Sequence, residues 1–183
     1  MSRVVAMGEI LWDEFPGQRR LGGAPANFAW HAHGLGLDAR MVSRLGNDVD
    51  GQAILARLRT MGMDVTALSI DPVYPTGRVL VHLDASGQPQ YDIVEGVAWD
   101  HLEATPDVLA LAARADVFCY GTLAQRHPAA RAGVTRALRE TPTACRRVFD
   151  INLRQHYYAA DVLVESLDLA TIVKLNDEEL PTV

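Results

Sequence analysis

The sequence predicts an α/β fold in which a mostly parallel central sheet lies between two layers of helices. Two observations indicate this fold. Short continuous apolar runs, such as 4–8 and 116–120, alternate with longer segments of helical period, which is the pattern of buried parallel strands joined by helices. In contrast, segments 77–84 and 90–95 alternate apolar and polar residues, which is typical of antiparallel strands with one face in solvent. We therefore expect a small antiparallel sheet beside the main one.

The elements of the main body follow in chain order. A helix begins at Pro25, because proline suits the first turn of a helix, and it ends near the glycines at 34 and 36. A second helix extends to Met61 from the possible N-cap residues Asp48 and Asp50. Further strands are expected over 39–43, 147–151 and 171–175, and further helices over 106–114, 128–140 and 159–169.

The small sheet is expected to combine two separate parts of the chain. Residues 11–15 and 19–21 form two strands joined by a turn at Pro16 and Gly17. The strands at 77–84 and 90–95 are joined by a turn over 85–89. The sequence contains no internal repeat, low-complexity tract or linker, so residues 1–183 are expected to belong to one α/β domain.

Composition excludes several classes of protein. The 183 residues carry a formal charge of −6, whereas a nucleic-acid scaffold requires a basic face. No apolar stretch approaches the roughly 18 residues of a membrane span, and the apolar run after Arg3 is too short for the core of a signal peptide. Cys119 and Cys145 are too far apart for a CxxC unit and lie in apolar runs, which favours buried free thiols in a reducing compartment. We therefore expect a cytoplasmic protein without nucleic-acid or membrane partners.

The segment Leu21–Asn27 has the features of a ligand-binding loop. Gly22 and Gly23 allow positive φ and a close approach of the backbone to a ligand. Pro25 and Asn27 occupy the first turn of the following helix, where several backbone N–H groups are free. An amide side chain beside such N–H groups suits a hydroxyl-rich or anionic ligand. The alternatives are a plain glycine-rich loop, with Asn27 tying the helix to it.

Polar side chains also follow the predicted strands, at the edge where open parallel sheets bind ligands. Asp13 follows the first strand, Asn152 and Arg154 follow the strand at 147–151, and Asn176 follows the last strand. Asp13 can accept two hydrogen bonds from hydroxyl groups, and Arg154 offers a planar pair of donors for a carboxylate or phosphate. The alternatives are an exposed residue for Asp13 and a surface salt bridge for Arg154.

A further candidate pair lies near the end of the sequence. Glu179 lies three residues after Asn176, so both share one face of a helix that is expected to open at Asn176. A glutamate in a first turn also favours the helix dipole without binding any ligand. Leucine rather than serine or threonine follows Lys174, so the sequence has no P-loop and must hold any phosphate by other means.

Five motifs in this order resemble the ribokinase-like (PfkB) family of carbohydrate kinases, and look most like its fructokinase branch. They are Gly8-Glu9-Ile10-Leu11-Trp12-Asp13, Leu21–Asn27, Arg44-Leu45-Gly46-Asn47-Asp48 with Gly51, Asp150-Ile151-Asn152-Leu153-Arg154, and Asn176-Asp177-Glu178-Glu179. The resemblance runs from Val4 to the last residue. It implies a ribokinase-like three-layer αβα fold in which the small sheet, made from segments 11–21 and 73–96, forms a lid over the sugar.

The resemblance also implies a role for each candidate residue. Asp13, Gly22, Gly23 and Asn27 would bind the sugar, and Arg154 would lie near the sugar or the transferred phosphate. The phosphates of ATP would be held by Asn152, Asn176 and Glu179, and Glu179 would also support Mg²⁺, largely through water. The implied reaction is the transfer of the γ-phosphoryl group of ATP to a sugar hydroxyl, with fructose as the expected substrate.

One motif of the family has no counterpart in the sequence. The family's second signature, a Gly-Ala-Gly-Asp turn, carries the catalytic base. We therefore expect the sugar-binding part of an incomplete domain, without the C-terminal part of the fold and inactive on its own. The alternatives are a kinase for 2-keto-3-deoxygluconate or ribose, and a truncated, non-catalytic sugar-binding module. A homodimer through the exposed strands of the lid is also expected.

Overall fold

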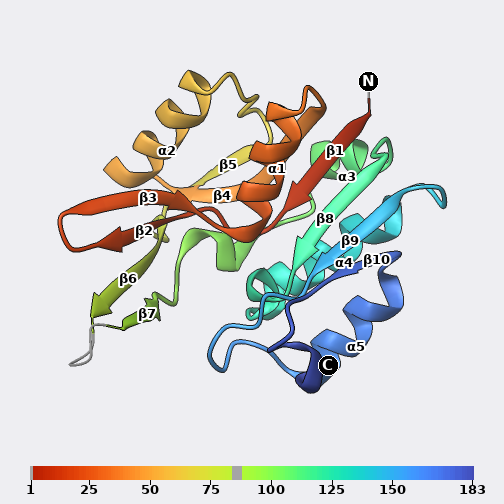
Figure 1. Ribbon diagram of the computed structural model, residues 1–183. Coiled ribbons are helices and arrows are strands. Elements are labelled where there is room, and N and C mark those ends of the chain that lie inside the picture. Colours follow the sequence, from red (N-terminus) through yellow and green to blue (C-terminus); the bar gives the residue numbers. More distant parts are fainter. Residues whose placement is uncertain (1, 84–87) are drawn as a thin grey trace.

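The computed structural model describes residues 2–83 and 88–183, which form two sheets of different kinds (Figure 1). Within these residues the main sheet is parallel throughout, with the strand order β10-β9-β8-β1-β4-β5. Its strands are β1 (Arg3–Met7), β4 (Asp38–Gly46), β5 (Leu68–Asp71), β8 (Val117–Gly121), β9 (Arg146–Asp150) and β10 (Ile172–Lys174). The predicted α/β class is confirmed.

Helices cover both faces of the main sheet (Figure 1). One face carries α1 (Ala24–Gly34) and α2 (Val49–Thr60). The other face carries α3 (Pro106–Ala112), α4 (Pro128–Glu140) and α5 (Ala160–Leu169). Short 3₁₀ helices, η1 (Ala98–His101), η2 (Leu123–Gln125) and η3 (Leu180–Thr182), lie in the connections. The three layers are those of an αβα sandwich.

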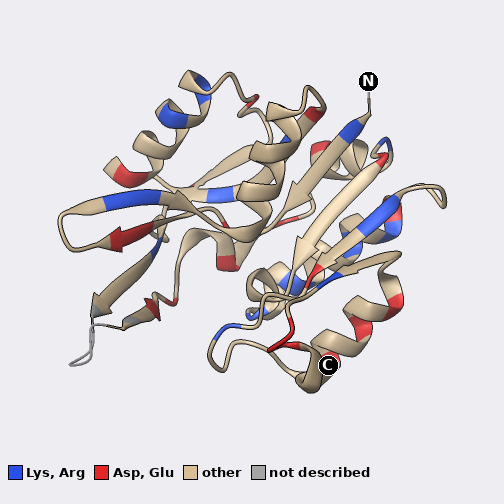
Figure 2. Ribbon diagram, in the orientation of Figure 1, with Lys and Arg blue, Asp and Glu red and all other residues tan. Residues whose placement is uncertain are grey.

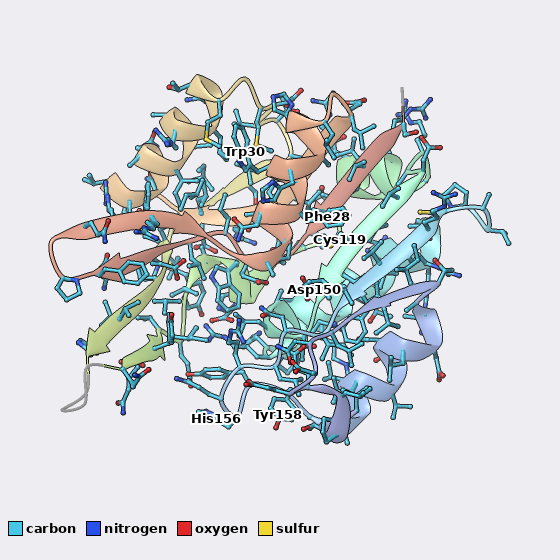
Figure 3. All side chains as sticks on the ribbon, in the orientation of Figure 1. Phe28, Trp30, Cys119, Asp150, His156 and Tyr158 are labelled. Carbon is cyan, nitrogen blue, oxygen red and sulfur yellow. The ribbon has the colours of Figure 1, made fainter. Side chains whose placement is uncertain are left out.

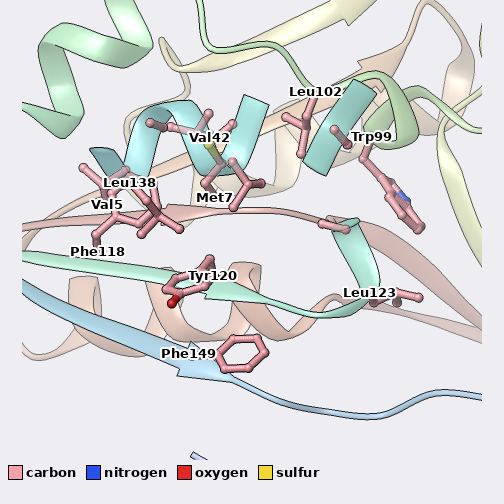
Figure 4. Packing of buried hydrophobic residues seen from close by; sticks show 14 of the residues in the cluster. Val5, Met7, Val42, Trp99, Leu102, Phe118, Tyr120, Leu123, Leu138 and Phe149 are labelled. Carbon is pink, nitrogen blue, oxygen red and sulfur yellow. The ribbon is translucent and has the colours of Figure 1, made fainter. Parts of the chain in front are cut away.

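The alternation of side chains along β1 explains why this strand is apolar throughout. Val5 points to one face of the sheet and belongs to a core cluster with Phe118 of β8 and Leu138 of α4 (Figure 4). Ala6 points to the other face and belongs to a second cluster with Ala29 of α1. Because both faces of the strand are buried, each residue contributes to the core, and a continuous apolar run results.

The second sheet, which we call the lid, has the strand order β3-β2-β6-β7. Its strands are β2 (Leu11–Phe15), β3 (Gln18–Gly22), β6 (Gly77–Leu83) and β7 (Pro89–Ile93). The two expected hairpins are antiparallel, but β2 and β6 run parallel to each other. The lid is therefore a mixed sheet rather than an antiparallel one, and β6 lies inside it rather than at an edge. The turn expected over 85–89 falls largely outside the described residues.

Two further elements differ from the sequence prediction. Strand β5 at the edge of the main sheet was not expected, because two of its four residues are exposed and no continuous apolar run marks it. The helix expected at Asn176 is instead a turn over 177–179 followed by η3.

Charged residues of both signs occur on the lid and on the main body (Figure 2). In the part of the chain that the structure describes, no helix combines the length and apolar character needed to cross a membrane.

Candidate functional site

A cavity of about 660 Å³ is lined both by the lid and by residues at the carboxyl ends of the main strands. This edge of an open α/β sheet is where ligands bind. The polar side chains that line the cavity come from Glu9 after β1, from the lid residues Asp13 and Tyr91, from Asn27 and His31 of α1, and from Asp150, Asn152, Arg154 and Lys174 at or after the ends of β9 and β10. Gly23 also lines the cavity. Of the residues that sequence reasoning assigned to the sugar, Asp13, Gly23, Asn27 and Arg154 are thus brought together.

Asp13 lies in β2 and its carboxylate faces the cavity half buried. Burial raises the pKa of Asp13, and the positive charge of Arg154 partly opposes this rise. Gly22, in the paired strand β3, has no side chain, and its Cα faces the space that the Asp13 carboxylate occupies. Although Gly22 does not line the cavity itself, it therefore determines where the Asp13 carboxylate can lie.

The loop before α1 has glycine at its N-cap, so it is held by its backbone and by the Glu9 side chain. Gly23 has a φ of 107°, and a Cβ at this position would lie 2.4 Å from the carbonyl oxygen of Glu9, so glycine is required. The next N–H group, that of Ala24, donates to Oε1 of Glu9 at 3.0 Å. Asn27 is exposed, and its side-chain amide has no hydrogen bond to any described residue. It is therefore free to bind a ligand in the cavity.

An ion pair lies at the ends of the two outermost strands on this side. The Asp150 carboxylate at the end of β9 accepts hydrogen bonds of 2.8 and 3.0 Å from Nζ of Lys174 at the end of β10. Figure 3 shows Asp150 at the carboxyl end of its strand, near Cys119 of β8. Because Lys174 compensates the charge of Asp150, this part of the cavity carries little net charge.

The segment after β9 carries two of the predicted residues. Asn152 has a φ of 42°, a left-handed conformation that asparagine tolerates better than most residues. Arg154 is exposed, and its Nη1 donates to the carbonyl oxygen of Leu153 at 3.0 Å. Its charge acts on Asp13 across the cavity. Among the described residues, the Arg154 guanidinium forms no salt bridge with an acidic side chain. Both Asn152 and Arg154 can thus reach a ligand.

Glu179 and Asn176 form a reciprocal capping arrangement outside the cavity. Oε2 of Glu179 accepts from the N–H of Asn176 at 2.9 Å, and Oδ1 of Asn176 accepts from the N–H of Glu179 at 2.8 Å. Oε1 of Glu179 accepts from the N–H of Leu153 at 2.9 Å, which ties this turn to the segment after β9. The carboxylate is therefore buried with both oxygens bonded, and it does not fit the role of a direct Mg²⁺ ligand.

In residues 2–83 and 88–183, no group of three or more His, Cys, Asp and Glu side chains is placed to hold a metal ion.

The loop that carries Arg154 is also bonded to the lid. The side-chain amide of Gln155 donates to the carbonyl oxygen of Tyr91, and the hydroxyl of Tyr157 donates to the carbonyl oxygen of Ile93 at 3.0 Å. These carbonyl groups belong to the lid strand β7. One edge of the lid is thus covered by this loop rather than free.

Sequence reasoning missed Glu9 and Lys174, although Glu9 lies in a motif that it singled out. Glu9 directly follows β1, so the rule that placed Asp13 and Asn176 at strand ends applies to Glu9 as well. Its burial could not be read from the sequence, because it depends on how β9 and α1 meet around it. His31, Phe28 and Tyr91 also line the cavity and carry no comparable signal in the sequence.

The chain thus combines a parallel αβα body with a small sheet over a polar cavity. The sequence matches the profile described as the pfkB family carbohydrate kinase over residues 9–183, and the chain belongs to this family. It is 30% identical over 196 residues to fructokinase-1 of Zea mays, covering 97% of this chain and 61% of that protein. It is 29% identical over 190 residues to a fructokinase of Klebsiella pneumoniae, covering 98% of this chain and 62% of that protein.

Solved structures give the same picture of the fold. The sugar kinase PH1459 of Pyrococcus horikoshii, solved in complex with ATP, superposes with a TM-score of 0.86 at 25% identity, over 98% of this chain and 65% of that chain. The resemblance to the ribokinase-like family and the three-layer fold are therefore confirmed. The chain spans about 60% of the length of the maize and Klebsiella pneumoniae fructokinases.

Proposed function

We propose that this chain is the sugar-binding part of an ATP-dependent carbohydrate kinase that transfers the γ-phosphoryl group to a sugar hydroxyl, with fructose as the expected sugar. The observation that carries this proposal is the grouping of Asp13 and Asn27 in one cavity beneath the lid. A carboxylate accepts hydrogen bonds from two hydroxyls, and an amide both donates and accepts, which is how proteins bind polyols. Family membership and the fructokinase relatives support the reaction and the sugar.

Each residue of the cavity has a role in this proposal. Asp13 and Asn27 bind hydroxyl groups of the sugar, while Gly22 and Gly23 keep the carboxylate and the loop backbone in place. Arg154 provides a positive charge near the sugar or the transferred phosphate. Residues 1–183 form one incomplete domain in this proposal, and the lid segments 11–21 and 73–96 cover the sugar.

ATP is the proposed phosphate donor, supported by the ATP complex of the P. horikoshii relative. Phosphoryl transfer of this kind uses Mg²⁺ to neutralise charge on the phosphates. In this chain, Asn152 and Asn176 are the proposed phosphate contacts. Glu179 acts indirectly, because its carboxylate holds the backbone of Asn176 and Leu153 in position. Any contribution of Glu179 to Mg²⁺ would pass through water.

The test is a comparison of sugars with the whole gene product. Fructose, ribose and 2-keto-3-deoxygluconate are each supplied with ATP and Mg²⁺, and ADP release is followed with a coupled assay. We expect sugar-dependent ADP release with the highest kcat/KM for fructose. A preference for 2-keto-3-deoxygluconate would assign Arg154 to the substrate carboxylate, and a preference for ribose would place the sugar differently in the same cavity. Binding of a sugar without turnover would indicate a non-catalytic sugar-binding module.

A further inference from the structure

Glu9 is a second carboxyl group in the cavity, and it is held very differently from Asp13. Glu9 is only 1% exposed, although it is one of the residues that line the cavity. Oε1 accepts the N–H of Ala24 at 3.0 Å, whereas Oε2 is buried without a hydrogen-bond partner among the described residues. A buried polar atom without a partner lowers stability, so the position of Oε2 favours a partner that the described residues do not provide.

The surroundings of Glu9 favour its neutral form. Complete burial raises the pKa of Glu9 from 4.5 to about 7, and the negative charge of Asp150 contributes to this rise. Hydrogen bonds from backbone N–H groups and the charge of Arg126 act in the opposite direction, but are outweighed by burial. Cys119 of β8 also lies within electrostatic reach, and burial raises the pKa of its thiol, so it stays uncharged.

The location of the proton follows from the hydrogen bond to Ala24. Because Oε1 accepts an N–H group, a neutral Glu9 carries its proton on Oε2. A carboxyl O–H donates a hydrogen bond and requires an acceptor. The oxygen of a sugar hydroxyl is such an acceptor, and Glu9 lines the cavity proposed to hold the sugar.

We propose that Glu9 binds the sugar as a neutral carboxylic acid, with its Oε2–H group donating to a hydroxyl oxygen, so that sugar binding depends on a proton held inside the protein. This inference rests on the proposed function, because it concerns the same cavity. It assigns opposite roles to the two acidic residues: Asp13 accepts hydrogen bonds from the sugar, and Glu9 donates one. The purely structural alternative is that Glu9 serves only to hold the N–H of Ala24.

The two readings differ in how affinity depends on pH. If binding requires protonated Glu9, the association constant falls by about tenfold per pH unit above about pH 7, and binding takes up a proton. In the Glu9→Gln variant, the amide oxygen can still accept from Ala24 and the NH₂ group can donate to the sugar at every pH. That variant should bind at about pH 6 within roughly threefold of the wild type and should show no loss at higher pH.

The experiment is isothermal titration calorimetry of the whole gene product between about pH 6 and pH 9, in buffers of different ionisation enthalpy. Fructose, ribose and 2-keto-3-deoxygluconate serve as the probes. His31 also lines the cavity, so the His31→Gln variant is measured as well and should keep the dependence on pH. Circular dichroism confirms that the variants are folded.

Each outcome decides the proposal. Falling affinity and proton uptake in the wild type, both absent in Glu9→Gln, would support it. Sugar binding that is independent of pH in the wild type, or a dependence that persists in Glu9→Gln, would overturn the role of Glu9 and leave the proposed function standing. Failure of the wild type to bind any of the three sugars at about pH 6 would overturn both.

Discussion

Gly22 and Asp13 occupy complementary space in the paired strands β2 and β3: a Cβ at Gly22 would lie 2.2 Å from Oδ2 of Asp13. The conflict is with the end of a side chain rather than with backbone, so an added methyl group would displace the carboxylate and leave the strands paired. The glycine thus fixes the direction in which the proposed sugar ligand Asp13 points.

We therefore expect Gly22→Ala to weaken sugar binding with little loss of stability. Displacing a charged acceptor costs about 1–3 kcal/mol, which is a loss of affinity of roughly 5- to 150-fold. Gly34→Ala is the matched control, because a Cβ at the end of α1 has nothing within 4 Å. Titration of sugar into both variants measures the effect, and equal affinities would show that Asp13 does not bind the sugar from its present position.

Removing the carboxylate itself should affect the sugar and not the nucleotide. In the whole gene product, Asp13→Ala should lower kcat/KM for the sugar by a factor equivalent to about 1–3 kcal/mol, with ATP binding little changed. Glu14→Ala is the control, because side chains of neighbouring residues on a strand point to opposite faces of the sheet. Steady-state kinetics with unchanged sugar parameters in Asp13→Ala would contradict the assignment.

The buried Glu9 should make folding stability depend on pH. Its pKa is about 7 in the folded chain and ordinary, near 4.5, once it is exposed by unfolding. Between these values the folded state holds a proton that the unfolded state has lost, so the free energy of unfolding falls as pH rises, by about 1.4 kcal/mol per pH unit and about 3 kcal/mol in total. Below the lower value the contribution of Glu9 is fully present, and above about pH 7 it is lost.

Glu9→Gln should remove this dependence. Urea unfolding of both proteins between about pH 4.5 and 8 gives the difference in the free energy of unfolding, in which the titrations of the other carboxyl groups cancel. The difference should shift in favour of the variant as pH rises to about 7 and then stay constant. A difference that does not change with pH would mean that the pKa of Glu9 is the same in the folded and unfolded states.

The 183-residue chain alone should bind sugar weakly but should not phosphorylate it. The cavity carboxylates have other partners or proposed roles: Asp150 is paired with Lys174, Glu9 holds Ala24, and Asp13 faces the sugar. ADP release in the presence of fructose, ATP and Mg²⁺ should therefore equal the rate without sugar. Sugar-dependent turnover of about 1 s⁻¹ or more, an ordinary enzyme rate, would show that one of these carboxylates acts as the base.

Assembly through the lid is expected to use β3. The edges of the lid are β3 and β7, and Gln155 and Tyr157 already bind carbonyl groups of β7. Pairing of β3 with the β3 strand of a second copy would give a homodimer of twice the 20.0 kDa mass of this chain. Light scattering at micromolar concentration measures the mass, and a monomer would contradict the prediction.

Local patterns in the sequence predicted the elements whose burial is uniform. The continuous apolar run 4–8 predicted β1, because both faces of that strand are covered. Strand β5 has no such run, since its position at the edge leaves Ser69 and Ile70 exposed. The parallel pairing of β2 with β6 could not be predicted, because it joins residues about 66 positions apart and depends on how two hairpins meet.

The same distinction holds for the site. The strand-end rule brought Asn152 and Arg154 to the cavity, since carboxyl ends of parallel strands share an edge of the sheet, whereas Asp13 reaches it from the lid strand β2. The three-residue spacing of Asn176 and Glu179 was also visible in the sequence, but the role of Glu179 was not, because its carboxylate binds a distant N–H group, that of Leu153. The protonation of Glu9 depends on its burial, which is a property of the assembled fold.

The hydrogen bonds from Gln155 and Tyr157 to β7 link the loop that carries Arg154 to the lid. An outward movement of the lid would either break both bonds, at a cost of about 1–3 kcal/mol in total, or carry this loop along. In the second case, the guanidinium of Arg154 would leave the cavity together with the lid and would return when the lid closes. The positive charge of Arg154 would then contact a bound substrate only after the lid has closed over the cavity, so that the fit of the substrate in the cavity would be tested before its charge.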